Sequence, residues 1–98
     1  MTIPSVGVFV PSLARREAPV PDVVSAAVHA DSLGFESAWA VDQLVAGQGN
    51  AILESTLVLA ASAAVTERIS LGVGVLIAPL REPAWIAKEV ATLQQPLP

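Results

Sequence analysis

Cysteine is absent from the 98-residue sequence, and histidine occurs once, at His29. Without cysteine the chain has no disulfide, no thiolate metal ligand and no thiol nucleophile. One histidine has no second imidazole or thiolate to share a metal ion with, so we predict no metal site. It falls on the polar stripe of a predicted helix, which indicates a solvated side chain. The serines stand in no recognisable hydrolase motif, which argues against a catalytic triad.

Basic residues are also scarce, with five Lys and Arg against nine Asp and Glu and a net charge of −4. Phosphate binding needs a basic patch, so we expect no nucleic-acid partner. The N-terminal apolar run is preceded by no positive charge, unlike a signal peptide. No uncharged apolar run approaches the roughly 20 residues of a membrane span. We therefore expect no membrane partner and a cytoplasmic location.

Apolar residues, by contrast, are abundant, at 53% of the chain against 14% charged residues. The length suits one small domain, which we place at residues 1–98. A chain this short leaves roughly a third of its surface uncovered even when it is fully compact. Such an apolar sequence is therefore either a piece of a larger core or one protomer of an assembly.

Three apolar runs alternate with three helical patterns along the chain. This β-α-β-α-β-α order, in units of about 30 residues, predicts an α/β fold with a parallel sheet and right-handed crossovers. We expect the first strand to be buried on both sides, and the second helix to bury one alanine-rich stripe. The expected strands are 6–10, 37–41 and 69–77, and the expected helices are 22–33, 53–66 and 83–93. The expected loops are 12–21, 43–50 and 79–82, and the stripe is Leu53, Leu57, Ala60, Ala61, Ala64 and Val65.

The third apolar run carries Gly72 and Gly74 on one face and branched residues on the other. Glycine weakens a strand unless something needs the space. Either a flat ligand or another backbone approaches closely there, or the glycines allow tight packing within the sheet. The pair is not a dinucleotide loop, because it lies inside the strand, lacks a third glycine and opens no helix.

Ligand sites of parallel α/β folds lie at the carboxyl ends of the strands. That rule selects the neighbourhood of Val10, the pair Asp42 and Gln43, and residues 78–81. The Asp42 carboxylate could bind a cofactor hydroxyl or orient a substrate, or it could cap the loop backbone as Asp often does. We interpret Trp39 and Trp85 as packing residues.

Four segments together resemble the luciferase-like monooxygenases. They are Ala30 to Leu44 (ADSLGFESAWAVDQL), Ala64 to Leu76 (AVTERISLGVGVL), Pro79 to Pro83 (PLREP) and Ala87 to Leu93 (AKEVATL). That family folds as a (β/α)₈ TIM-type barrel and binds FMN or the deazaflavin coenzyme F-420. The resemblance implies the first three units of an incomplete barrel, a partial domain ending before strand four. It further implies an oxidoreductase that performs hydride transfer or oxygenation on a small organic substrate.

The resemblance also implies particular site residues. A non-prolyl cis peptide at Gly74-Val75 would lie against the flavin ring, so Asp42, Gly74 and Val75 are the expected cofactor-binding residues. Asp42 and Gln43 are the expected catalytic residues. Gln43 stands where the family often has histidine, and an amide exchanges no proton near neutral pH, so it would act by hydrogen bonding. The alternatives are a truncated, non-catalytic fragment, or a subunit whose barrel is completed by another chain or by further copies of itself. The exposed sheet edges are where such self-association is expected.

Overall fold

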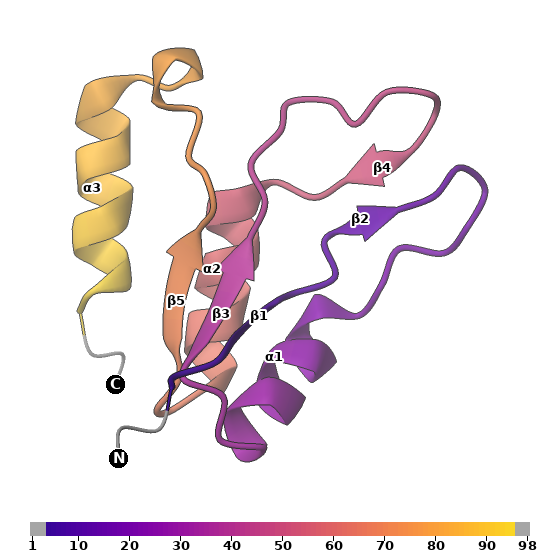
Figure 1. Cartoon of the computed structure of the whole chain (residues 1–98). Helices are drawn as coiled ribbons and strands as arrows, with labels where there is room; N and C mark the ends of the chain where they lie inside the picture. The colour runs from indigo at the N-terminus through magenta and orange to yellow at the C-terminus, as the bar shows by residue number, and fades with distance from the viewer. Residues whose placement is uncertain (1–3, 96–98) are drawn as a thin grey trace.

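The structure is a computed structural model that describes residues 4–95, so the expected domain limits at 1 and 98 lie outside the described residues. Strands, helices and one short 3₁₀ turn follow one another along the chain (Figure 1). In order they are β1 (Gly7–Phe9), β2 (Leu13–Ala14), α1 (Val23–Ser32), β3 (Ser37–Ala40), β4 (Ala51–Ile52), α2 (Ser55–Val65), β5 (Ser70–Val73), η1 (Ala78–Leu80) and α3 (Pro83–Leu93).

The main sheet is parallel and has the strand order β1-β3-β5. Gly7 pairs with Ser37, and Ser37 pairs in turn with Ser70. Each parallel connection carries a helix, as the sequence pattern predicts. The α/β class and the alternation of three sheet strands with three helices are thereby confirmed.

Two expectations about strands and loops are wrong in detail. The third strand ends at Val73 rather than at residue 77. Gly74 still donates its N–H to the Ala40 carbonyl, but the Ile77 N–H turns to the Asp42 side chain instead of a neighbouring strand. Leu13–Ala14, inside the expected loop 12–21, forms a two-residue antiparallel ladder, β2 with β4, whose partner Ala51–Ile52 lies between the expected loop 43–50 and the expected helix 53–66. So short a ladder leaves too little alternation to be read from sequence.

Small side chains join the helices to one face of the sheet. Ala38 and Ala40 of β3 are fully buried, as is Ala27 of α1, and Val58 of α2 packs in the same cluster. Figure 1 shows α1 and α2 on the same side of the sheet, with α3 standing beside β5. Alanines at these positions let the helix backbones lie close to the strands.

The opposite face of the sheet is open, which corrects the expectation that strand 6–10 is buried on both sides. Val10 lies in the core beneath the helices, whereas Phe9 points the other way and is 62% exposed. Trp39 is 38% exposed but also packs on the backbone of neighbouring strands. Trp85 of α3 is 64% exposed, so its expected packing role is wrong within this chain.

The expected buried stripe of the second helix is also wrong. Leu57 is 70% exposed, while its neighbour Val58 is 3% exposed. Nearly every position of α2 is apolar or small, so the sequence contains little contrast from which to read the phase of the helix. The residues that α2 buries are Ser55, Val58, Leu59 and Ser62.

The boundaries of α1 follow the sequence closely. Asp22 caps the helix by accepting the Ser25 N–H at 3.0 Å, and Gly34 takes the left-handed conformation (φ 84°) after its end. His29 is exposed, as predicted. Asp31, near the end of α1, accepts the backbone N–H groups of Glu67, Arg68 and Ile69 and so fixes the turn into β5. Within residues 4–95, no helix has the length and apolarity to cross a bilayer.

Candidate functional site

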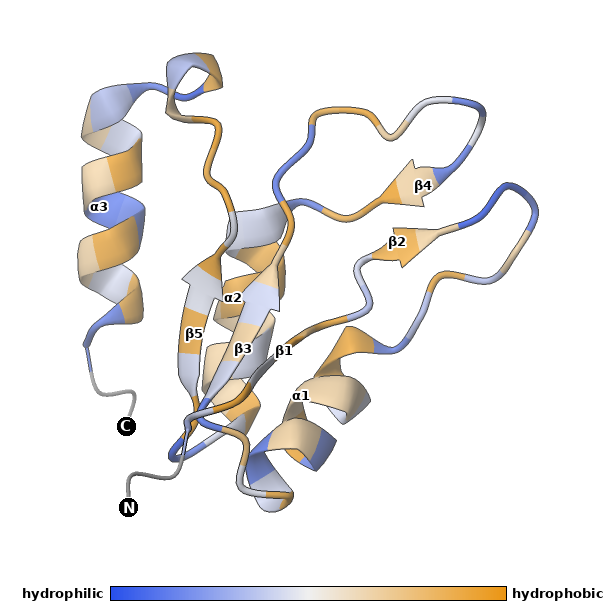
Figure 2. Cartoon of the chain, viewed as in Figure 1, coloured by the Kyte–Doolittle hydropathy of each residue, from blue (hydrophilic) through white to orange (hydrophobic). Residues whose placement is uncertain are grey.

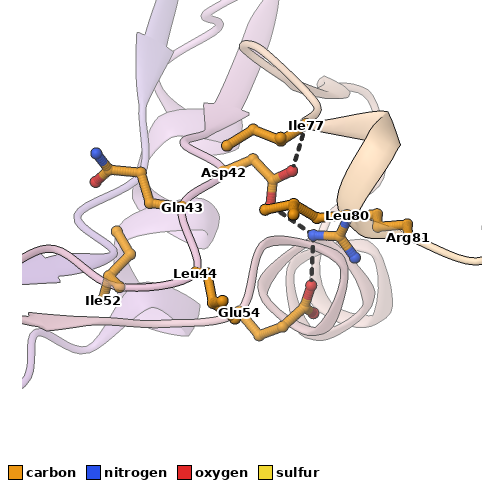
Figure 3. Close-up of a pocket in the computed structure, with 8 residues that line it drawn as sticks. All are labelled: Asp42, Gln43, Leu44, Ile52, Glu54, Ile77, Leu80 and Arg81. Carbon is orange, nitrogen blue, oxygen red and sulfur yellow. Dashed lines mark hydrogen bonds and ion pairs between the residues drawn. The ribbon is translucent and has the colours of Figure 1, made fainter.

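A pocket opens at the carboxyl edge of the main sheet, where α/β folds place their ligands. Its volume is about 210 Å³. The residues that line it come from the segments after β3 and β5 and from the approach to α2 (Figure 3). They are Asp42, Gln43, Leu44, Ile52, Glu54, Ile77, Leu80 and Arg81.

The Asp42 carboxylate stands at the back of this pocket, two residues beyond the end of β3, and its side chain is only 7% exposed. Its Oδ2 accepts the Ile77 N–H at 2.7 Å. Its Oδ1 accepts the Ser55 hydroxyl at 2.8 Å and the Arg81 guanidinium at 2.5 Å. Asp42 therefore does cap loop backbone, as one of the two sequence interpretations expected, and it does so from the wall of the pocket.

Arg81 joins the two acidic side chains of the pocket. Its Nη2 lies 2.8 Å from Glu54 Oε1 as well as against Asp42, and it also donates to the Ser55 hydroxyl at 3.0 Å. Glu54 is in turn the N-cap of α2, where its Oε2 accepts the Leu57 N–H. The cluster thus connects the end of β3, the start of α2 and the segment after η1.

Burial and hydrogen bonding act in opposite directions on these carboxyls. Desolvation raises the pKa of Asp42, but donors from Arg81, Ile77 and Ser55 outweigh it, so the net pKa lies below the usual value. For Glu54 as well, hydrogen bonds outweigh desolvation and hold the pKa below its usual value. The pKa of Arg81 is raised, chiefly by its hydrogen bond to Asp42. Near neutral pH all three groups are charged.

The peptide bond between Gly74 and Val75 is cis, as the resemblance implied. It lies directly after β5, and the Val75 side chain is 81% exposed. A Cβ at position 74 would be 3.6 Å from the Trp39 ring and 3.8 Å from the Phe9 ring, so the backbone there lies beside two aromatic side chains. Figure 2 shows most of the coil between β5 and η1 as apolar, after a pale stretch directly above β5.

The two glycines of the third strand have different surroundings. Gly72 lies under the indole ring of Trp39, which occupies the space a side chain would need. Tight packing, the second of the two sequence interpretations, therefore accounts for Gly72. Gly74 has only ordinary contacts around it, so the close-approach interpretation stays open at that position.

The remaining predicted residue, Gln43, lines the pocket, but its side chain points away from the Asp42–Arg81 pair (Figure 3). Sequence reasoning selected residues 78–81 only as a region, and it missed Glu54 and Ser55. A signal existed for Glu54, because an acidic residue just before an apolar helical run is a helix-start pattern. In the described part of the chain, no three His, Cys, Asp or Glu side chains come together as a metal ion requires.

Comparison with known families identifies the family of the chain. The family model described as luciferase-like monooxygenase matches residues 5–97. The chain belongs to the luciferase-like monooxygenase family. No curated protein and no solved structure matches the chain. Luciferase-like monooxygenases generally depend on a flavin-type cofactor, whose ring system is flat. The exposed surface around Gly74 and Val75 is the part of this chain that could lie against such a ring.

In polarity, that surface fits such a ring. Val75 projects into open space, and Gly74 has no side chain to obstruct a ring. The exposed rings of Phe9 and Trp39 extend the apolar surface beside it. A flavin ring stacks readily on apolar and aromatic groups, because contact of this kind removes two apolar surfaces from water.

Proposed function

We propose that this chain supplies the first three βα units of a (β/α)₈ barrel in a flavin-type oxidoreductase. The cofactor is FMN or coenzyme F-420, and the reaction is hydride transfer or oxygenation of a small organic substrate. The observation that carries the proposal is the exposed apolar surface of Val75, Phe9 and Trp39 around Gly74. Val75 stands two residues before Ile77, which lines the Asp42 pocket at the carboxyl edge of the parallel sheet. Membership of the luciferase-like monooxygenase family supports it.

On this proposal, the residues around the pocket have separate roles toward the cofactor and the substrate. Gly74 and Val75 back the cofactor ring, which would cover their exposed apolar surface. When bound, the cofactor supplies the redox chemistry, while the protein supplies its orientation. Asp42 carries a fixed negative charge at the pocket wall and accepts hydrogen bonds. Gln43, whose amide exchanges no proton near neutral pH, is suited to hydrogen-bonding the substrate.

The pocket offers little positive charge to bind the phosphate of the cofactor. Among the described residues that line the pocket, Arg81 is the single cation, and it is already paired with Asp42 and Glu54. A phosphate would have to compete with two carboxylates for it. We therefore propose that this chain contacts the ring of the cofactor, through Gly74 and Val75, and not its phosphate.

Cofactor titration tests the proposal. Purified chain is mixed with FMN or with F-420, and the fluorescence of the cofactor is followed. Saturable quenching is expected, with Val75→Asp weakening it by about tenfold or more, because a charge is costly to bury against an apolar ring. The matched control is Val24→Asp, on the exposed first turn of α1, which should bind like the parent chain. Absence of binding at high micromolar cofactor would refute the proposal for this chain.

A second candidate function is favoured by the open face of the sheet. The chain exposes 7032 Å², whereas a compact monomer of its mass exposes about 5,300 Å². Both β1 and β5 are edge strands of the parallel sheet, and such edges accept further strands. On this alternative, the chain is a subunit whose site is complete only when a second copy covers the face that bears Phe9 and Trp39.

Sedimentation velocity distinguishes this alternative from the first. A concentration-dependent dimer or larger species is expected, and Phe9→Lys should shift it toward monomer because the charge falls on the covered face. Leu33→Lys, at the exposed C-terminal end of α1, is the matched control and should leave the association unchanged. A well-behaved monomer at high micromolar concentration would contradict the subunit proposal.

A further inference from the structure

The Arg81 side chain makes three polar contacts at the site, as many as Asp42 makes, and it makes all of them through one nitrogen. Its Nη2 donates to Asp42 Oδ1, Glu54 Oε1 and the Ser55 hydroxyl. Asp42 follows β3, whereas Glu54 and Ser55 begin α2. The side chain is only 19% exposed, so these contacts are largely shielded from water.

The Asp42 carboxylate accepts hydrogen bonds from both ends of the segment 77–81. Oδ2 accepts the Ile77 N–H just before η1, and Oδ1 accepts the guanidinium of Arg81 just after it. Figure 3 shows the two dashed contacts converging on the carboxylate from the two sides of η1. One carboxylate thus closes residues 77–81 into a loop directly downstream of Gly74-Val75.

We propose that Arg81 is a positioning residue, which orients the Asp42 carboxylate and thereby fixes the segment of Val75 against the start of α2. The part of the proposal that concerns the cofactor rests on the proposed function, because Val75 matters there as the surface that backs the ring. The part that concerns Asp42 and residues 77–81 stands without any cofactor.

The chemistry of the contact predicts which substitutions preserve it. All three contacts are made by a single nitrogen, so a lysine ammonium with its three N–H groups can replace part of them. Methionine has a similar length but no donor and no charge. Arg81→Met would therefore leave Asp42 buried with the Ser55 and Ile77 donors alone, whereas Arg81→Lys would keep a cation beside it.

Titration of the Asp42 side-chain carboxyl by ¹³C NMR measures the effect of the Arg81 cation on Asp42 directly in the 98-residue chain. In Arg81→Met the titration midpoint of Asp42 should rise, because burial still disfavours the carboxylate and the cation is gone. The groups that face Asp42 from the elements around it are Arg81, Glu54, Ser55 and the Ile77 N–H, so Glu54 is followed in the same spectra. Arg81→Lys should fall between the parent and Arg81→Met. Arg15→Met, which removes an exposed arginine outside the cluster, should leave the midpoint unchanged.

Hydrogen exchange reports the segment itself. The Ile77 amide should exchange about tenfold faster in Arg81→Met, since losing one well-shielded hydrogen bond costs on the order of 1.4 kcal/mol. FMN binding should weaken in Arg81→Met and remain in Arg15→Met. An unchanged Asp42 titration midpoint together with an unchanged Ile77 exchange rate would overturn the positioning role. If Arg81→Met does not fold, the same two measurements are made on Arg81→Lys. Absence of FMN binding in the parent chain would refute the proposed function while leaving these two readouts decisive.

Discussion

The indole ring of Trp39 lies across Gly72 so closely that a Cβ at position 72 would come within 2.7 Å of Cζ3 and 2.8 Å of Cε3. The ring also donates its Nε1–H to the Ser37 hydroxyl at 2.9 Å, which fixes its orientation. A rigid aromatic group held in this way cannot give way as the tip of a flexible side chain does. The contact explains why the third strand has no side chain at this position.

Gly72→Ala is accordingly expected to destabilise the chain. Overpacking of this kind costs about 1–3 kcal/mol, because ring or backbone must shift to admit the methyl group. Urea unfolding followed by circular dichroism measures the loss, and the emission of Trp39, read in a Trp85→Phe background, reports whether the ring has moved.

A double-mutant cycle isolates the cause. In a Trp39→Leu background the ring is absent, so adding Gly72→Ala should cost far less than it does alone. Equal costs in the two backgrounds would show that the alanine acts through the backbone and not through the ring.

Val58 and Leu57 offer a test of how α2 faces the sheet. Val58→Ala should cost about 2 kcal/mol, from two lost methyl groups and the cavity they leave. Leu57→Ala should stay within about 0.5 kcal/mol, because the side chain is already largely in water. The free energy of unfolding of the two variants is compared under one set of conditions. A larger loss at Leu57 would mean that another chain covers that side of the helix.

Asp31→Asn should lower the urea midpoint, because an amide oxygen accepts the three N–H groups of the β5 turn less well than a carboxylate. The hydrogen bond from the Glu67 N–H leads the causes that hold the pKa of Asp31 below its usual value. A depressed folded-state pKa gives stability that is present above the unfolded pKa, about 3.9, and is lost as the pH falls through the folded-state pKa. The difference between parent and variant should thus be largest near neutral pH and shrink below about pH 4.

Asp22→Asn is the matched control for this comparison. Its carboxylate also accepts a backbone N–H, but at the N-cap of α1, where asparagine serves about as well as aspartate. The midpoint should change less there than at Asp31. A pH-independent difference between the parent chain and Asp31→Asn would contradict the role of the charge.

The order of the three sheet strands and the three α-helices could be predicted because the signals for them were local. Asp22 and Gly34 mark the two ends of α1, and a proline stands at the first position of α3. Side-chain direction was harder to predict where the contrast between apolar and polar positions was weak. In α2 almost every residue is apolar or small, so the phase taken from alanine spacing was wrong. The burial of Phe9 depends on what covers the sheet.

The candidate site was predictable in part for the same reason. Asp42 and Gln43 follow a strand directly, so the rule for the carboxyl edge finds them, and family resemblance adds Gly74-Val75. The partners of Asp42 are a different matter. Arg81 and Glu54 are 39 and 12 residues away from it along the chain, respectively, and only the packing of α2 against β3 and β5 brings them together. Side-chain geometry of this kind is set by tertiary contacts, which no local pattern records.

The register of the main sheet also bears on how the chain reaches its fold. Gly7 pairs with Ser37 and Ser37 with Ser70, so every ladder in this sheet joins segments about one βα unit apart, and none can begin as a hairpin. Closing each such loop costs conformational entropy before the strand pairing contributes any stabilising free energy. Helical turns, which need only neighbouring residues, form on a much shorter timescale. Folding should therefore be limited by bringing preformed helices and distant strands together, and the sheet should be the last part of the chain to become ordered.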